Sequence, residues 1–424
     1  AGLVLWMVPA FVFAGAIEVD PVLPATMPWD LVALSEAPAM RWIVEEGAIR
    51  ELIYESEPIA GEATEVFAFY ASPATIGGDD GVDGGPFPAV VLVHGGGGTA
   101  FSEWVWLWAQ RGYAAIAMDL SGRRPPAPKM DAETGALVED LGRNRKDRVR
   151  LERGGPEQGH GEKFESIGGS VEDDWPYHAV ASVIRAHSLI RSFPEVDAER
   201  TALTGISWGG YTACIVASVD NRFAAAVPVY GCGFLRDGDS VQREPIDKLG
   251  EERASEWVAT YDPGSYLAAC RVPMLFVNGT HDIHYPLDSY AKSYRLVEKT
   301  ERSVRIELKM RHSHPAGWAP TEIGLFIDSH CRGGVPLATV AAPVFEKGGR
   351  VRVSFEAEVP VVSAALLYTA DEGPRSKREW VSVPAAVGEG EIVAAGLPAD
   401  ANTWFVTLED ERGAMVSSEV GFRE

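Results

Sequence analysis

The sequence predicts an α/β protein, in which a mostly parallel sheet has helices on both faces, followed by a small C-terminal all-β sandwich domain. Between residues 89 and 330, apolar segments of strand length alternate with helical segments, a pattern typical of buried parallel strands joined by crossover helices. From residue 338 onward, short alternations of apolar and polar residues, separated by turn residues, predict strands alone. The 424 residues leave room for both parts.

The first expected elements precede the main sheet. Residues 2–17 carry no charge and end in small residues, so residues 1–17 are expected to be the remnant of a secretory signal peptide, and the protein to be secreted or periplasmic. The alternative is an apolar segment that packs on the domain. Residues 49–72 alternate between apolar and polar side chains on both sides of residues 58–61, as in a β-hairpin.

The main sheet and its helices are expected within residues 18–334, which we assign to one α/β domain. The expected strands are 89–93, 114–119, 201–205, 224–230, 273–278 and 304–310, and the expected helices are 102–111, 176–193, 208–219, 287–298 and 321–330. Two long insertions, residues 121–174 and 231–271, interrupt this pattern. Because long loops beside a sheet usually shape a binding site, we expect them to select the substrate.

Residues 338–424 are expected to form a separate β-sandwich of the immunoglobulin or fibronectin III type. The expected strands are 350–356, 362–369, 391–395, 404–409 and 415–422. This region contains no cysteine, so the disulfide typical of antibody domains is missing.

The charge balance narrows the classes of partner. Lys and Arg number 38 and Asp and Glu 61, which gives a net charge of −23 at pH 7. Such a surface repels phosphate backbones and anionic lipid, so neither a nucleic-acid partner nor stable membrane insertion is expected. Neutral or weakly charged substrates fit better. Four cysteines without a CxxC spacing predict neither a disulfide scaffold nor a zinc or redox site, although one or two disulfides remain open.

The strongest chemical signal is the sequence GISWGG at residues 205–210, between an expected strand and an expected helix. A nucleophilic serine needs a strained strand-to-helix turn that exposes its hydroxyl, and glycines at the flanking positions avoid collisions there. The helix N-terminus also stabilises negative charge that develops near the serine. Ser207 is therefore the candidate nucleophile.

A second motif, HGGGG at residues 94–98, follows the apolar strand AVVLV. Acyl transfer needs backbone amides aimed at a tetrahedral oxyanion, and glycines let the main chain come that close. We expect one oxyanion-hole donor from Gly96 or Gly97 and another from the Trp208 amide, with His94 bracing the loop. The alternatives are a flexible turn or a phosphate loop, but no GK[ST] follows.

A serine nucleophile also needs an acid and a base later in the chain. Asp282 directly follows the expected strand PMLFVN and is the candidate acid, with Asp288 as the alternative. The base should follow the strand VRIELKM, where His312 and His314 both lie in reach. We favour His314, because a loop of several residues normally separates the strand end from the base, and keep His312 as the alternative.

The same segments contain a possible set of metal ligands. His281, Asp282, His284, His312 and His314 have side chains that zinc accepts. No HExxH or related helical motif supports a metal site, however, so neither a metal nor a cofactor is expected.

With these motifs in place, residues 45–334 resemble the α/β-hydrolase superfamily. Within it they are similar to the branch of dienelactone hydrolases, acetyl xylan esterases and prolyl-oligopeptidase-type peptidases. The matching segments are HGGGG, GISWGG, GTHDIHYP at 279–286 and HSHPAGW at 312–318. The resemblance implies Ser207 as nucleophile, Asp282 as acid and His314 as base. It departs from the branch in one respect, since His-Ser-His stands where a Gly-His-Gly context is common.

Three functions follow as hypotheses. The first is a serine carboxylic-ester hydrolase that forms an acyl-enzyme and acts on a small-molecule or polysaccharide ester, such as acetylated xylan. The second is a serine exopeptidase of the prolyl-oligopeptidase type with the same triad. The third is a non-catalytic carbohydrate-binding protein whose β-sandwich does the binding.

Overall fold

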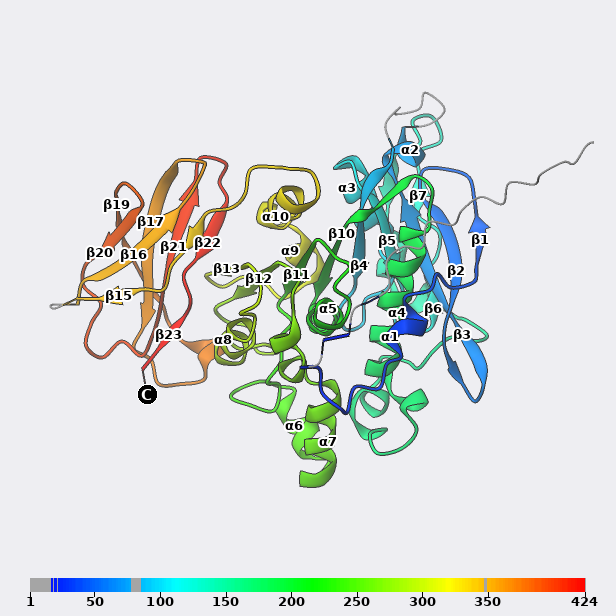
Figure 1. Ribbon diagram of the computed structural model, residues 1–424, viewed down its shortest axis with the longest axis horizontal. Helices are drawn as coiled ribbons and strands as arrows, with labels where there is room; N and C mark the ends of the chain where they lie inside the picture. Colours follow the sequence, from blue (N-terminus) through cyan, green and yellow to red (C-terminus); the bar gives the residue numbers. More distant parts are fainter. Residues whose placement is uncertain (1–16, 18, 21, 78–84, 347–348, 424) are drawn as a thin grey trace, which may run out of the picture.

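The main sheet of the computed structural model has six parallel strands at its centre (Figure 1). The model describes residues 17, 19–20, 22–77, 85–346 and 349–423, so residues 1–16 of the expected signal peptide lie outside the described residues. The parallel strands, in their order across the sheet, are β5 (Ala114–Met118), β4 (Phe87–Val93), β10 (Val196–Ile206), β11 (Ala225–Val229), β12 (Met274–Gly279) and β13 (Arg302–Glu307). Three antiparallel strands extend the sheet beyond β5, namely β3 (Glu62–Ala71), β2 (Arg50–Ile59) and β1 (Met40–Val44). The hairpin expected over 49–72 is thus confirmed as β2 and β3.

Helices cover both faces of this sheet, and the expected parallel core is confirmed. One face packs against α3 (Ser102–Gln110) and α10 (Thr321–Cys331), and the other against α4 (Trp175–Arg191) and α5 (Trp208–Val219). Strands β4, β5, β11 and β12 are buried along their whole length, because helices lie on both sides of them. The remaining helices are α1 (Leu31–Leu34), α2 (Pro73–Ile76), α6 (Arg243–Asp247), α7 (Glu251–Tyr261), α8 (Leu287–Arg295) and α9 (His314–Trp318).

The two insertions contain short elements. Residues 121–174 form two small antiparallel pairs, β6 (Arg123–Arg124) with β9 (Val149–Arg150) and β7 (Lys129–Met130) with β8 (Leu137–Glu139). Three 3-10 turns and a π-helix complete this insertion, and they are Leu141–Arg143, Arg145–Asp147, Val171–Asp173 and Gly161–Glu165. The insertion over 231–271 carries α6, α7 and two 3-10 turns, Pro263–Ser265 and Leu267–Ala269.

The C-terminal region consists of antiparallel strands in two sheets. One contains β14 (Thr339–Val340), β16 (Val351–Glu356), β20 (Glu391–Ala394) and β19 (Ala386–Val387), with β15 (Val344–Phe345) paired to β16. The other contains β22 (Met415–Ser417), β21 (Thr403–Asp410), β17 (Val361–Thr369) and β18 (Val381–Pro384), with β23 (Gly421–Phe422) paired to β21. This second sheet continues the main sheet, because Ser417 pairs with Val304 of β13. The immunoglobulin or fibronectin III topology stays a prediction.

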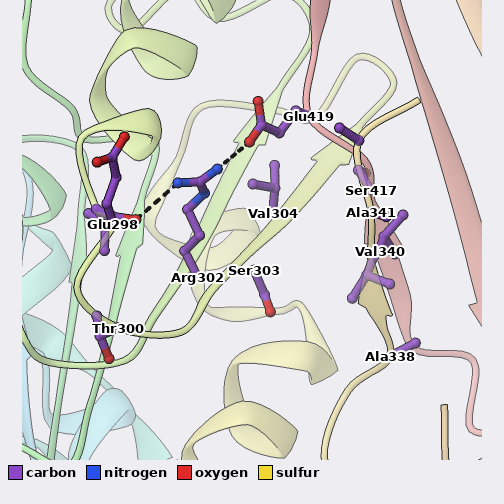
Figure 2. Close-up of a pocket in the computed structure, with 13 residues that line it drawn as sticks. Glu298, Thr300, Arg302, Ser303, Val304, Ala338, Val340, Ala341, Ser417 and Glu419 are labelled. Carbon is purple, nitrogen blue, oxygen red and sulfur yellow. Dashed lines mark hydrogen bonds and ion pairs between the residues drawn. The ribbon is translucent and has the colours of Figure 1, made fainter. Parts of the chain in front are cut away.

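Polar contacts hold the seam between the main sheet and the C-terminal strands. The Arg302 guanidinium bonds to Glu419 and to the Val297 carbonyl (Figure 2). A cavity of about 450 Å³ opens beside this pair. Arg302 begins β13, whereas His312 follows the end of the same strand. This cavity therefore lies at the amino ends of the strands, and the candidate catalytic residues lie at their carboxyl ends.

Candidate active site

Ser207 lies at the turn between β10 and α5, with φ +59° and ψ −118°. Few residues with a side chain adopt a positive φ, and the Ser207 amide holds this conformation by donating to the Val229 carbonyl at 2.8 Å. The flanking glycines leave no room for a side chain, since a Cβ on Gly205 would collide with the Gly209 carbonyl and one on Gly209 with that of Val93. The sequence thus folds into the strained turn that a nucleophilic serine requires.

His312 links the serine to an acid. Its Nε2 lies 2.8 Å from Ser207 Oγ and its Nδ1 lies 2.6 Å from Asp282 Oδ2. Because the carboxylate accepts a hydrogen bond from Nδ1–H, the proton of the neutral ring stays on Nδ1 and Nε2 is free to accept the Ser207 hydroxyl proton. The side chain of His312 is 25% exposed, whereas that of Asp282 is 2% exposed. The imidazole is therefore open to a substrate and the carboxylate is not.

Two backbone amides fix the other oxygen of the acid. Asp282 Oδ1 accepts hydrogen bonds from the amides of His284 and Tyr285, both at 2.8 Å. With Oδ1 held in the loop after β12, Oδ2 points to His312. The alternative acid, Asp288, instead lies in α8 and pairs with Arg375 at 3.1 Å.

The prediction that His314 is the base is wrong, because His312 and not His314 lies at the serine. His314 Nε2 accepts a hydrogen bond from the Gly95 amide at 2.9 Å, and its ring packs on Phe101 at 4.8 Å. The error comes from the strand length, because β13 ends at Glu307 and not at residue 310. The loop therefore already brings the first histidine, His312, to the serine, and His314 begins α9.

Two histidines hold the peptide groups of the glycine loop. The Leu120 amide donates to His94 Nε2 at 2.8 Å, so His94 carries its proton on Nδ1 and donates it to the Gly95 carbonyl at 2.8 Å. The Gly95 amide in turn donates to His314. Burial lowers the pKa of both rings, that of His314 to about 3, so both are neutral at pH 7. The expected bracing role of His94 is confirmed, and His314 shares it.

The loop presents one glycine amide beside the serine. A Cβ on Gly96 would lie 3.1 Å from the Trp208 ring, so this glycine sits directly against the residue after the nucleophile. Among the described residues, neither the Gly96 amide nor the Trp208 amide has a hydrogen-bond acceptor. The Gly97 amide, in contrast, donates to Gln158 Oε1 at 2.9 Å. Of the three expected donors, Gly97 is therefore occupied, while Gly96 and Trp208 are free for an oxyanion.

Three aromatic neighbours of His312 were not expected from the sequence. Tyr230 stacks on the His312 ring at 4.5 Å, and Tyr285 lies nearly parallel to it at 6.2 Å. The His284 ring packs at 4.7 Å, and burial lowers its pKa. These rings keep the imidazole in one plane. The only sequence signal was their position, since Tyr230 directly follows β11 and the other two lie two and three residues after Asp282.

The histidine-rich segments do not form a metal centre. Across residues 17, 19–20, 22–77, 85–346 and 349–423, no group of three or more His, Cys, Asp or Glu side chains is arranged to hold an ion. His281 bonds to the Thr280 hydroxyl at 2.7 Å, and His314 faces the glycine loop. The four cysteines, all described, are buried and unpaired.

Comparison with solved structures finds proteins of similar fold. The structure is similar to an acetyl xylan esterase from a Paenibacillus species, with 20% identity, 70% of this chain and 91% of that chain covered, and a TM-score of 0.50. It is also similar to acetyl xylan esterase 1 from a Thermoanaerobacterium species, with 15% identity, coverage of 70% and 90%, and a TM-score of 0.50. At these identities the likeness concerns the fold. The chain matches no curated protein sequence.

No helix of the described part of the chain is both long and apolar enough to cross a bilayer.

The model of the prolyl oligopeptidase family matches residues 152–323, a range that contains Ser207, Asp282 and His312. Residues 152–323 are thus similar to the prolyl oligopeptidase family, and the fold is that of the α/β hydrolases.

Proposed function

We propose that this protein is a serine carboxylic-ester hydrolase that works through an acyl-enzyme. The observation that carries the proposal is the pair of short contacts that joins Ser207 to His312 and His312 to Asp282, at 2.8 Å and 2.6 Å. A hydroxyl within reach of a base, which is itself oriented by a carboxylate, is the arrangement that activates a serine.

The geometry supports the following course. His312 takes the hydroxyl proton while Ser207 Oγ attacks the ester carbonyl, and the amides of Gly96 and Trp208 stabilise the oxyanion that forms. His312 then gives the proton to the leaving alkoxide, which departs as an alcohol. A water molecule, deprotonated by His312, hydrolyses the acyl-enzyme and restores Ser207. Asp282 holds the imidazole tautomer and stabilises the imidazolium throughout.

Esters of carbohydrates, with acetylated xylan as the type case, are the proposed substrate class. The likeness to acetyl xylan esterases supports it at the level of the fold. The partial exposure of His312 also supports it, since a polymer chain must reach the site from solvent. Export to the periplasm or the medium, where such polymers occur, remains part of this proposal.

A serine exopeptidase is the second candidate, favoured by the match to the prolyl oligopeptidase family. The same triad serves both reactions, so the substrate separates them. Faster cleavage of aminoacyl-p-nitroanilides than of p-nitrophenyl acetate would favour the peptidase. A non-catalytic carbohydrate-binding protein would instead bind glycan and resist labelling by a fluorophosphonate.

The decisive variant is Ser207→Ala. We expect it to lower kcat for p-nitrophenyl acetate by on the order of 10⁴-fold or more and to abolish fluorophosphonate labelling, because no other group replaces the nucleophile. Ser329→Ala makes the same chemical change on α10, away from the site, and should leave both readouts unchanged. Normal turnover by folded Ser207→Ala would refute the proposal.

A further inference from the structure

A cation lies over the glycine loop. The guanidinium of Arg145 packs so closely on Gly97 that a Cβ at this glycine would overlap with it. Gly97 has a φ of +65° and stands two residues from Gly95, where a Cβ would lie 2.9 Å from Ser207 Cβ. Arg145 therefore sits within about 15 Å of the nucleophile, a distance bounded by the length of two peptide units and the contacts at each end.

Arg145 differs from the other arginines of the 121–174 insertion. Among the described residues it has neither an ion pair nor a side-chain hydrogen bond, and it is exposed. Each of the other six bonds to an acid or to backbone carbonyls, and these are Arg123, Arg124, Arg143, Arg148, Arg150 and Arg153. Arg148, for example, is buried and donates to the carbonyls of Gly97 and Gly98. Arg148 thus holds the glycine loop, while the Arg145 guanidinium remains without a hydrogen-bond partner among the described residues.

A second cation of the same insertion lies over Trp208, the residue that follows the serine. Lys163 Nζ rests 4.8 Å from the centre of the Trp208 ring, next to the nucleophile, and 5.9 Å from that of Trp175. It belongs to the π-helix Gly161–Glu165, a rare element that is frequent at functional sites. No described acid pairs with this ammonium group, although the charge of Glu162 acts on it.

Both cations remain charged at neutral pH. Burial lowers the pKa of Lys163 to about 8, so most of it is protonated at pH 7. A guanidinium does not lose its proton in this range. Desolvation of Lys163 without a partner acid costs free energy, and a bound anion would recover it.

Two cations near Ser207 lack an acidic partner in a protein that is acidic as a whole. The chain has a net charge of −23, yet among the described residues neither the Arg145 guanidinium on Gly97 nor the Lys163 ammonium over Trp208 forms an ion pair. We propose that Arg145 and Lys163 bind a carboxylate that the substrate carries near the scissile ester. This inference rests on the proposed ester hydrolysis and replaces the expectation of a neutral substrate with an acidic one.

A carboxylate can reach these groups from either side of the ester. On the acyl side the substrate would be a half-ester of a dicarboxylic acid, and on the alcohol side an acylated hydroxy acid, such as an acetylated acidic sugar. The chemistry recognised is the same in both, since a guanidinium and an ammonium each donate charge-assisted hydrogen bonds to carboxylate oxygens.

Two matched pairs of substrates test the inference. The acyl-side pair is p-nitrophenyl hydrogen glutarate and its methyl ester, and the alcohol-side pair is 4-acetoxybenzoate and its methyl ester. In at least one pair we expect kcat/KM of the wild-type protein to be about tenfold higher for the acid than for the neutral ester, a ratio typical of one charge-assisted contact. This ratio should fall in 0.5 M salt, because ions screen partly exposed charges.

Variants assign the preference to the two cations. Arg145→Gln and Lys163→Gln should each lower the ratio of acid to neutral ester about three- to tenfold, mainly through KM of the acid. Lys146→Gln is the matched control, since it removes the same charge one residue from Arg145 at an exposed position, and it should leave the ratio unchanged.

The outcomes separate this inference from the proposed function. If the protein hydrolyses the neutral esters but shows no preference for either acid, the carboxylate site is refuted and ester hydrolysis stands. An acid preference that survives both single variants and the double variant Arg145→Gln/Lys163→Gln also refutes it. Absence of hydrolysis of every ester, together with absence of fluorophosphonate labelling, refutes the proposed function itself.

Discussion

Strand β10 is associated with two hydroxyl–imidazole–carboxylate chains, one directly after its carboxyl end and one at its middle. Directly after the strand, Ser207 contacts His312, which contacts Asp282. At its middle the Thr201 hydroxyl lies 2.8 Å from His187 Nε2, and His187 Nδ1 lies 2.8 Å from Asp220. The two chains share connectivity and hydrogen-bond lengths, yet their surroundings differ in every respect that matters for catalysis.

The chain of Thr201, His187 and Asp220, called the buried chain below, is closed to a substrate. The side chains of His187 and Asp220 are 0% exposed, and Phe223 stacks on the imidazole at 3.5 Å. Arg222 donates to both oxygens of Asp220 at 2.8 Å, where Asp282 accepts only neutral backbone amides and His312. Thr201 also lies within β10 and not at a strained turn. A hydroxyl–imidazole–carboxylate chain becomes an active site only when a substrate can reach the hydroxyl. Free backbone amides must also face the oxygen on which negative charge develops.

The largest expected effect distinguishes the triad of Ser207, His312 and Asp282 from the glycine loop beside it. His312→Ala should lower kcat for p-nitrophenyl acetate by about 10³-fold or more, because the serine loses its base, and should change the free energy of unfolding little. Steady-state kinetics and urea unfolding of the same preparation provide the measurement.

His314→Ala is the matched comparison, two residues away. It removes the acceptor of the Gly95 amide and leaves the triad in place, so we expect a loss of about tenfold in kcat from a less ordered oxyanion loop. A larger loss in His314→Ala than in His312→Ala would overturn the assignment of the base.

The same two histidines show how far the sequence predicts this site. The order of glycine loop, serine, acid and histidine segment was readable because each motif follows a recognisable buried strand. The choice between His312 and His314 depended on where β13 ends, and strand ends are set by tertiary contacts that periodicity does not encode. Gly97 failed as a donor for a similar reason, because Gln158 reaches it from an insertion whose path no local pattern predicts.

The buried chain and the two unpaired cations had no sequence signal at all. His187 lies in α4, whereas Asp220 and Arg222 follow α5, and no sequence pattern links the histidine to this pair. Arg145 lies among several charged residues, a pattern typical of a solvated loop. Its contact with Gly97 arises only in the folded protein. Local patterns thus predict strands, turns and motifs, whereas contacts across insertions require the three-dimensional structure.

The second expected effect follows from a substitution that disrupts the buried chain. Asp220→Asn should lower the free energy of unfolding by about 3 kcal/mol, because it leaves the buried Arg222 guanidinium without a counter-charge. Activity per folded molecule should stay near that of the wild type, since β10 separates this chain from Ser207. Urea unfolding monitored by tryptophan fluorescence measures the change.

Asp282→Asn provides the opposite case. It should lower kcat strongly, because the imidazole loses its orienting carboxylate, and destabilise the protein less than Asp220→Asn, because Asp282 neutralises no buried cation. Equal stability losses in the two variants would contradict the distinction drawn between the chains.

The smallest effect is a pH dependence of stability that comes from the buried imidazole. Burial lowers the pKa of His187 to about 4 against the opposing charge of Asp220, while the unfolded chain has an ordinary value of about 6.5. Between these values the unfolded state binds the proton and the folded state does not. The contribution of His187 is therefore fully present above pH 6.5 and is lost as the pH falls toward 4, at up to about 1.4 kcal/mol per pH unit.

Comparison of wild type with His187→Gln isolates this contribution from that of the many surface carboxylates. Between pH 7 and pH 5 the wild type should lose about 1 to 2 kcal/mol more stability than the variant, because glutamine does not titrate. Urea unfolding at both pH values gives the two slopes. A variant slope equal to that of the wild type would mean that His187 is already protonated in the folded protein, and the buried chain would then be an ion pair and not a neutral relay.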